Sequence, residues 1–63
     1  MSRPVLLVQV GSRLPDLYVA HHAPEVGEVI DIRHGDGRVA LRVRVARKRR
    51  LETGRDLYLV EAE

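Results

Sequence analysis

Apolar and charged side chains alternate from Arg38 to Ala46, and this alternation constrains the fold more than any other feature of the chain. Valine or leucine occupies positions 39, 41, 43 and 45, whereas arginine occupies positions 38, 42 and 44. Successive side chains of a β-strand point to opposite faces, so a period of two is typical of a strand with one buried face. The pattern therefore predicts a strand whose valines lie in a core and whose arginines face solvent.

Four further segments are rich in β-branched residues or alternate between apolar and polar residues, and glycine or proline bounds most of them. The sequence predicts strands at residues 4–10, 16–21, 28–33, 38–46 and 56–62, with a polar loop at 47–54. Five short strands in one chain predict an all-β fold, a small five-stranded, half-open barrel of the SH3-like type. Residues 44–52 contain good helix formers, so one short helical turn near residues 46–52 is the alternative to the loop.

The strongest turn signal is the stretch from His34 to Gly37, which reads His-Gly-Asp-Gly. Glycine adopts positive φ without strain, as a tight hairpin requires. A turn centred on Gly35 and Asp36 would place Ile32 opposite Val39.

Residues 24–46 resemble the opening of SH3-like barrels, because Pro24-x-x-Gly27 precedes alternating apolar residues and the hairpin. The resemblance implies the same type of barrel here. Barrels of this type bind DNA, RNA or peptides, so the resemblance does not choose among these functions.

The chain has 63 residues, which predicts one domain over residues 1–63. A domain this small buries only ~60% of its unfolded surface and commonly needs disulfides, a metal or oligomerisation for stability. The chain has no cysteine, and both faces of its first predicted strand are apolar. We therefore expect a homodimer, and the residues predicted to mediate self-association are Val5, Leu6, Leu7, Val8 and Val10.

Basic residues are concentrated in one part of the chain. Residues 33–55 hold nine cations and two anions, a net charge of +7, whereas the other forty residues hold two cations and seven anions, a net charge of −5. A concentrated positive surface attracts phosphates and acidic proteins, and arginine donates paired hydrogen bonds to phosphate. The predicted polyanion-binding residues are Arg33, Arg38, Arg42, Arg44, Arg47, Lys48, Arg49 and Arg50.

The carboxylates of Asp56, Glu61 and Glu63 would neutralise part of this charge if the last strand pairs with the fourth. The arginine-rich segment also contains no aromatic residue on which a base could stack. Any binding to nucleic acid is therefore expected to involve backbone phosphates without sequence specificity.

The leading prediction is a non-enzymatic binding module that associates with nucleic acid. The alternative is a protein–protein or regulatory module that docks an acidic partner or acts through homodimerisation. The sequence predicts no catalytic residue and no cofactor, because its few hydroxyl side chains lie in no catalytic motif. It predicts no metal site, since the adjacent His21 and His22 would point to opposite faces of a strand. No segment approaches the ~20 apolar residues of a membrane span, so we expect a cytoplasmic protein.

Overall fold

The computed structural model describes residues 3–63, and the chain forms five strands and no helix within that range. The strands are β1 (Val5–Val10), β2 (Asp16–Val19), β3 (Val29–Arg33), β4 (Val39–Arg50) and β5 (Asp56–Ala62). The all-β prediction is confirmed, and only β4 departs from its predicted bounds by more than two residues. The described part of the chain contains no helix of the length and apolarity that a membrane crossing requires.

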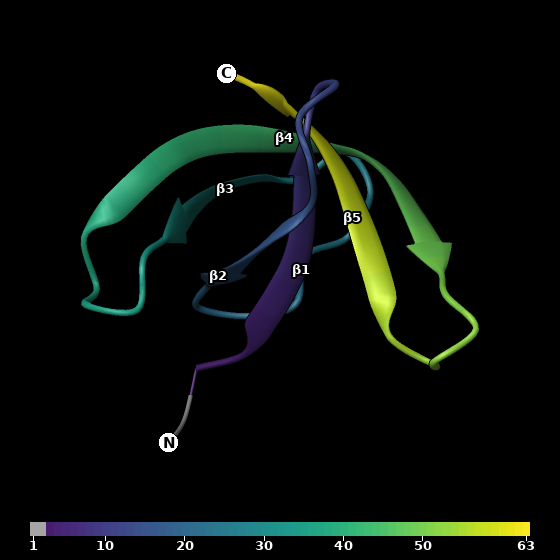
Figure 1. Cartoon of the computed structure of the whole chain (residues 1–63). Coiled ribbons are helices and arrows are strands. Elements are labelled where there is room, and N and C mark those ends of the chain that lie inside the picture. The colour runs from purple at the N-terminus through teal and green to yellow at the C-terminus, as the bar shows by residue number, and fades with distance from the viewer. Residues whose placement is uncertain (1–2) are drawn as a thin grey trace.

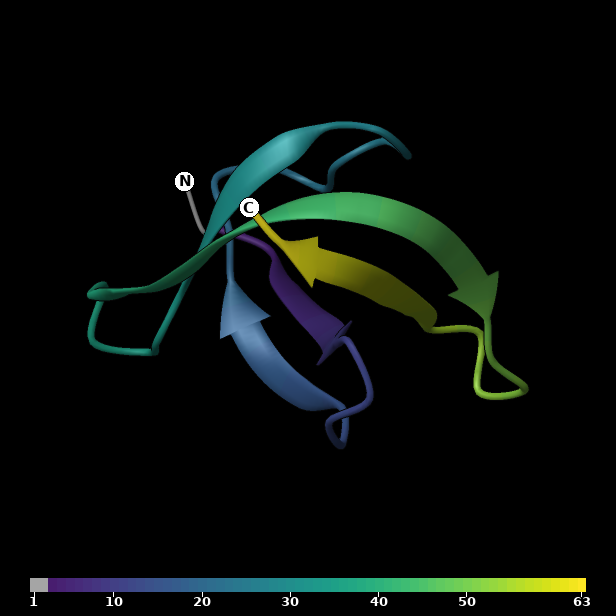
Figure 2. The ribbon, with the colours of Figure 1, turned by 90° about the horizontal axis from the view of Figure 1, so that it is seen from above.

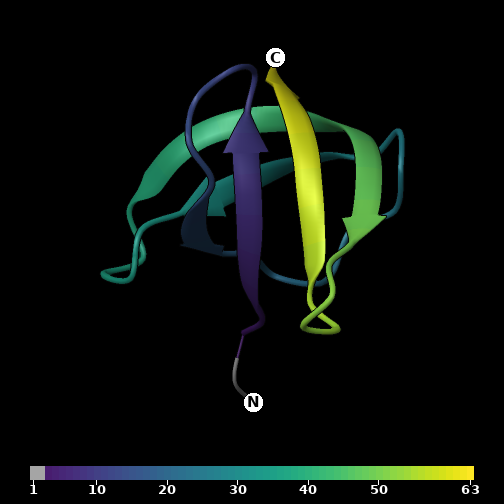
Figure 3. The same ribbon diagram turned by 45° about the vertical axis from the view of Figure 1, so that its right-hand side comes forward.

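The five strands form a closed ring in sequence order, so the half-open arrangement predicted from the sequence was wrong (Figure 1). Successive strands are antiparallel. Because their number is odd, the two strands that close the ring are parallel, with Leu7 of β1 opposite Leu57 of β5 (Figure 3). The weakest join lies between β2 and β3, which meet only where Val19 pairs with Arg33.

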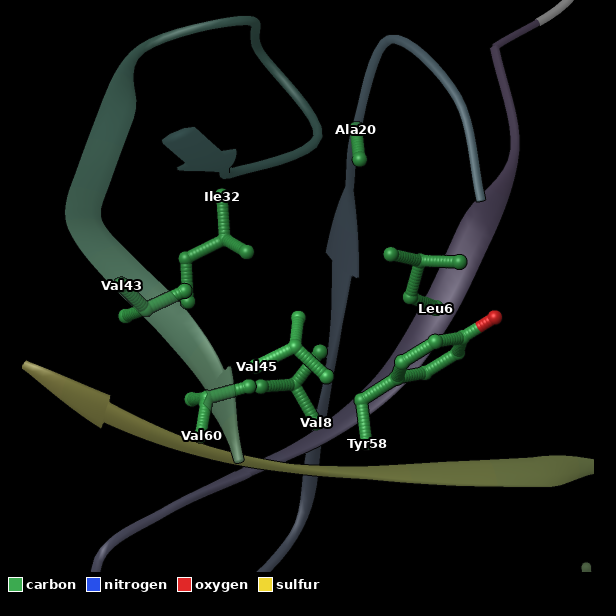
Figure 4. Close-up of a cluster of buried hydrophobic side chains, with 8 residues drawn as sticks. All are labelled: Leu6, Val8, Ala20, Ile32, Val43, Val45, Tyr58 and Val60. Atoms are coloured by element: carbon green, nitrogen blue, oxygen red, sulfur yellow. The ribbon is translucent and has the colours of Figure 1, made fainter. Parts of the chain in front are cut away.

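The core fills the inside of the ring with aliphatic side chains and one aromatic residue, Tyr58, in keeping with the scarcity of aromatic residues in the chain (Figure 4). Ile32 and Val43 are completely buried, and Pro24 reaches the interior from the connection between β2 and β3. One face of each strand points inward, in agreement with the period of two. The buried cluster consists of Leu6, Val8, Ala20, Ile32, Val43, Val45, Tyr58 and Val60.

β4 is long and bent. Its twelve residues span about 36 Å along the strand, more than the longest dimension of the molecule, 28 Å. The pairing with β5 shifts between Val45 and Arg47, so Ala46 is an extra residue that faces no partner of its own. Such a β-bulge bends a strand and increases its twist, and β4 curves over the ring in Figure 1.

The turn between β3 and β4 is longer than the sequence predicted. The N–H of Gly37 donates to the carbonyl of His34 at 2.9 Å, and the N–H of His34 donates to the carbonyl of Arg38 at 2.9 Å. Gly37 has a φ of 89°. This is a type I turn followed by a left-handed glycine, a three-residue loop instead of a two-residue one.

The additional residue in the turn and a second register shift, between Ile32 and Arg33, together move the register of the hairpin by two residues. Ile32 lies opposite Leu41, so the predicted pairing of Ile32 with Val39 was wrong. In the observed register Asp31 faces Arg42 directly across the two strands. The turn between β4 and β5 repeats the same hydrogen-bond pattern and ends on Gly54, with a φ of 88°.

Candidate polyanion-binding surface

The bulge at Ala46 determines where the arginines of β4 point. Without it, a period of two would place Arg47 on the inward face that Val45 occupies. With the extra residue, Val45 pairs with the buried Val60, and Arg47 pairs with Leu59 on the outside. Four arginines therefore share the outer face of β4, and we call them the outer arginine row: Arg42, Arg44, Arg47 and Arg49.

The polar loop predicted at residues 47–54 and the helical turn predicted near 46–52 were both wrong. β4 continues to Arg50, and only the residues after it form the turn. The reason is the partner strand, because Leu57 pairs with Arg49 and Asp56 with Arg50. Ladder hydrogen bonds and cross-strand contacts outweigh the weak helical preference of arginine and lysine.

Lys48 and Arg50 lie on the opposite side of β4 from the outer arginine row, because they pair with Tyr58 and Asp56. Both are exposed. The β4–β5 turn lies well away from β1 and β2 (Figure 2), so the end of this hairpin projects beyond the ring. The projecting hairpin therefore presents cations on both of its sides.

Two of the predicted polyanion-binding residues already have anionic partners within the chain. Arg44 Nη2 lies 3.3 Å from Glu63 Oε1, and Arg50 Nε donates to Asp56 Oδ1 at 2.7 Å. The prediction that carboxylates of the last strand neutralise part of the basic surface is confirmed for these two. Exposed ion pairs contribute only about 0–1 kcal/mol, so a phosphate can compete for either arginine at small cost.

Arg33 belongs to the β3–β4 turn more than to a binding surface. It is half-buried, and its Nη1 donates to the carbonyl of Gly37 at 2.9 Å. Arg38 is exposed in the same turn, where its backbone N–H donates to Asp36 Oδ1 at 2.9 Å. Among residues 3–63, the predicted cations whose side chains make neither an ion pair nor a hydrogen bond are Arg38, Arg42, Arg47, Lys48 and Arg49.

The residues predicted for self-association divide between the two faces of β1. Leu6 and Val8 are buried in the core, and Val10 packs against it. Val5 and Leu7 remain on the outside, next to their pairing partners on β2 and β5.

These outward residues form part of a larger apolar surface. Leu17 of β2 and Leu57 of β5 both pair with Leu7, and Leu59 follows on the same face of β5. Leu17 and Val5 are each 53% exposed. We call this set the outer apolar face: Val5, Leu7, Leu17, Leu57 and Leu59. Leu57 is itself buried, at 7% exposed, so Val5 and Leu17 supply most of the exposed apolar area. Arg47 and Arg49 of the outer arginine row border the outer apolar face, because they pair with Leu59 and Leu57.

A half-open pocket of about 190 Å³ lies at the other end of the outer arginine row. It is situated between β3 and the connection from β2. Its lining residues are His21, His22, Val29, Ile30, Asp31 and Arg42. Sequence reasoning missed this pocket because the two histidines and Arg42 are far apart in the chain, and only the assembly of β2, β3 and β4 brings them together.

The pocket wall is anchored through Glu28. Its Oε2 contacts His22 Nε2, and its Oε1 accepts a hydrogen bond from the N–H of Glu25 at 3.1 Å. The hydrogen bond from Glu25, followed by that from His22, holds the pKa of the Glu28 carboxyl below its ordinary value of 4.5. The connection is thereby tied to the beginning of β3.

The surface therefore offers the guanidinium groups of the outer arginine row as donors to anions. A small pocket lined by apolar and polar side chains lies beside Arg42, the first arginine of that row. Comparisons with protein-family models, with curated proteins and with solved structures found no match to this chain.

Proposed function

We propose that this ring of strands is a small SH3-like, non-enzymatic module that binds the phosphates of nucleic acid without sequence specificity. The observation that carries the proposal is the outer arginine row, in which the bulge at Ala46 keeps Arg47 and Arg49 on the same face as Arg42. The principal contacts are assigned to Arg42, Arg47, Lys48 and Arg49. Arg38, Arg44 and Arg50 are assigned a secondary part.

The chemistry of these side chains suits phosphate. A guanidinium group donates two parallel hydrogen bonds to phosphate oxygens, and residues two apart on a strand repeat every ~6.6 Å. Each neutralised phosphate releases a counterion, so affinity falls with salt in proportion to the number of contacts. Four contacts at about 0.9 each predict a slope of about −3.6 for log affinity against log salt on duplex DNA.

The test is fluorescence anisotropy of labelled random-sequence DNA and RNA, titrated with protein at several salt concentrations. The double variant Arg47→Gln/Arg49→Gln removes two contacts, so the slope on duplex DNA should become shallower, at about −1.8. The matched control is Arg3→Gln/Arg13→Gln, which removes the same charge from two exposed residues outside the basic segment.

Equal losses of affinity in the two double variants would show that net charge alone is responsible for binding. This result would refute the assignment to the outer arginine row. Failure of the wild-type protein to bind any of these probes at low salt would refute nucleic-acid binding. Poly-glutamate bound in their place would favour the alternative, a module that docks an acidic protein.

The outer apolar face supports a second candidate, self-association. Val5 and Leu17 expose apolar area on adjacent strands, and Leu7 lies between them in the same layer. Sedimentation velocity should show a concentration-dependent dimer, and Leu17→Glu should yield a folded monomer because it places a charge in the interface. A wild-type protein that remains monomeric at every concentration would rule this candidate out.

A further inference from the structure

We propose that the pocket beside Arg42 binds one nucleobase of the strand whose phosphates the outer arginine row holds, and that it prefers a base with an exocyclic amine. This inference rests on the phosphate binding of the proposed function and replaces its lack of sequence specificity with a preference at one base position. Four features of the pocket carry it: an open strand edge, its size, the chemistry of its wall and its balance of charge.

The first feature is an unpaired edge of β3. The N–H of Val45 donates to the carbonyl of Glu28 at 3.0 Å. Because hydrogen-bonded pairs alternate along an antiparallel ladder, Ile30 next directs its backbone groups to β4. Val29 and Asp31 direct theirs to the opposite edge, where the described residues supply no backbone partner. Two N–H donors and two carbonyl acceptors therefore remain at the pocket.

The second feature is the size and shape of the pocket. The connection between β2 and β3 runs back along β3 without pairing to it (Figure 2), and the space left between them is about 190 Å³. This is smaller than the ~300–1,000 Å³ of a site for a drug-sized ligand. It suits one ring system, and its open side leaves the sugar and phosphate of a strand in solvent.

The third feature is the chemistry of the wall. Val29 and Ile30 provide apolar surface, while His21 and His22 provide imidazole rings of the kind on which bases stack. The carboxylate of Asp31 accepts hydrogen bonds such as those donated by the N4 amine of cytosine. These histidines supply the aromatic surface that the arginine-rich segment itself lacks.

The fourth feature is the balance of charge. Asp31 and Arg42 face each other across the two strands and both line the pocket. The carboxylate disfavours a phosphate inside, and the guanidinium disfavours a cation. A neutral ring with hydrogen-bonding edges meets neither penalty, and Arg42 remains beside it for the neighbouring phosphate.

Three single strands of equal length and charge test the proposal: oligo-deoxycytidine, oligo-deoxyuridine and an abasic deoxyribose-phosphate strand. Cytosine and uracil have the same ring size, but uracil carries a carbonyl in place of the N4 amine of cytosine and an N–H donor in place of its N3 acceptor. We expect the cytidine strand to bind about tenfold more tightly than the uridine strand, because one charge-assisted hydrogen bond is lost. The abasic strand should bind most weakly.

The diagnostic variant is Asp31→Asn, since an amide both accepts from cytosine and donates to uracil and so should erase the preference. Asp36→Asn is its matched control, because it removes the same negative charge from an exposed turn residue outside the pocket. Loss of the preference in Asp31→Asn but not in Asp36→Asn would support the proposal.

Other results would overturn it in distinguishable ways. Equal binding of all three strands would refute base recognition and leave phosphate binding intact. A preference that survives Asp31→Asn would show that the pocket is not its source. Absence of binding to every strand at low salt would refute both the base pocket and the proposed function.

Discussion

Two glycines of one turn provide a stringent test of the structure, because they lie two residues apart and adopt different backbone conformations. Gly37 has a φ of 89°, whereas Gly35 is not among the glycines with positive φ. A Cβ atom added at either position would meet no other atom within 4 Å. Replacement by alanine therefore changes the energy of the backbone and little else.

The two substitutions should have opposite effects. A left-handed conformation costs a residue with a Cβ atom about 1–2 kcal/mol, which is the expected loss for Gly37→Ala. Gly35→Ala should stabilise the protein by about 0.4–1 kcal/mol, because it restricts the unfolded chain in a conformation that alanine tolerates. The total stability of a domain of 63 residues is roughly 3–9 kcal/mol, so a difference of this size is a large fraction of it.

Urea and thermal unfolding followed by far-ultraviolet circular dichroism measure the difference. Each kcal/mol shifts the melting temperature of a domain this small by about 4–8 °C, so Gly37→Ala should melt clearly below Gly35→Ala. The reverse order would show that Gly35, and not Gly37, adopts the positive φ, as in the two-residue turn predicted from the sequence. It would contradict the three-residue loop and, with it, the register that places Asp31 opposite Arg42 at the base pocket.

Two further predictions concern the core and the pocket wall. Ile32→Ala should cost about 2–5 kcal/mol because the side chain is completely buried, whereas Leu14→Ala, at a residue 89% exposed, should change stability by less than about 0.5 kcal/mol in the same urea titrations; similar costs at both sites would contradict the assigned core. The lowered pKa of Glu28 means that its ionised carboxyl stabilises the fold above its ordinary pKa and that this contribution disappears as the pH falls through the folded pKa. Melting temperatures measured between about pH 3 and pH 6 should therefore fall less steeply for Glu28→Gln than for the wild type, and parallel curves would show that Glu28 does not stabilise the connection.

Local patterns were sufficient to predict most of the fold. The period of two located four strands to within two residues, and the glycines marked the turn that joins β3 to β4. The register of that hairpin was wrong, because the sequence indicates neither the second register shift between Ile32 and Arg33 nor whether Gly35 or Gly37 takes the positive φ. That choice depends on how the two strands twist against each other, which is a property of the assembled sheet.

The site was harder to predict because its geometry depends on residues distant in sequence. Arg47 to Arg50 read as a loop or a helical turn, and only pairing with β5 makes them a strand. No residue around Ala46 predicts the bulge from the sequence, yet the bulge places Arg47 and Arg49 on the outer face of β4. His21 and His22 meet Arg42 only after three strands are in place, so their contribution was invisible in the sequence.

The parallel pair that closes the ring separates the beginning of β1 from the end of β5. The two points lie at opposite ends of the barrel (Figure 3), and the six residues of β1 alone span about 20 Å. Parallel strands cannot be joined by a two-residue hairpin and need a crossover connection of about a dozen residues. A circular permutant of this domain therefore requires a linker that runs the length of the barrel. Fluorophores placed before β1 and after β5 would be held a fixed distance apart in the folded state, so energy transfer between them would report folding.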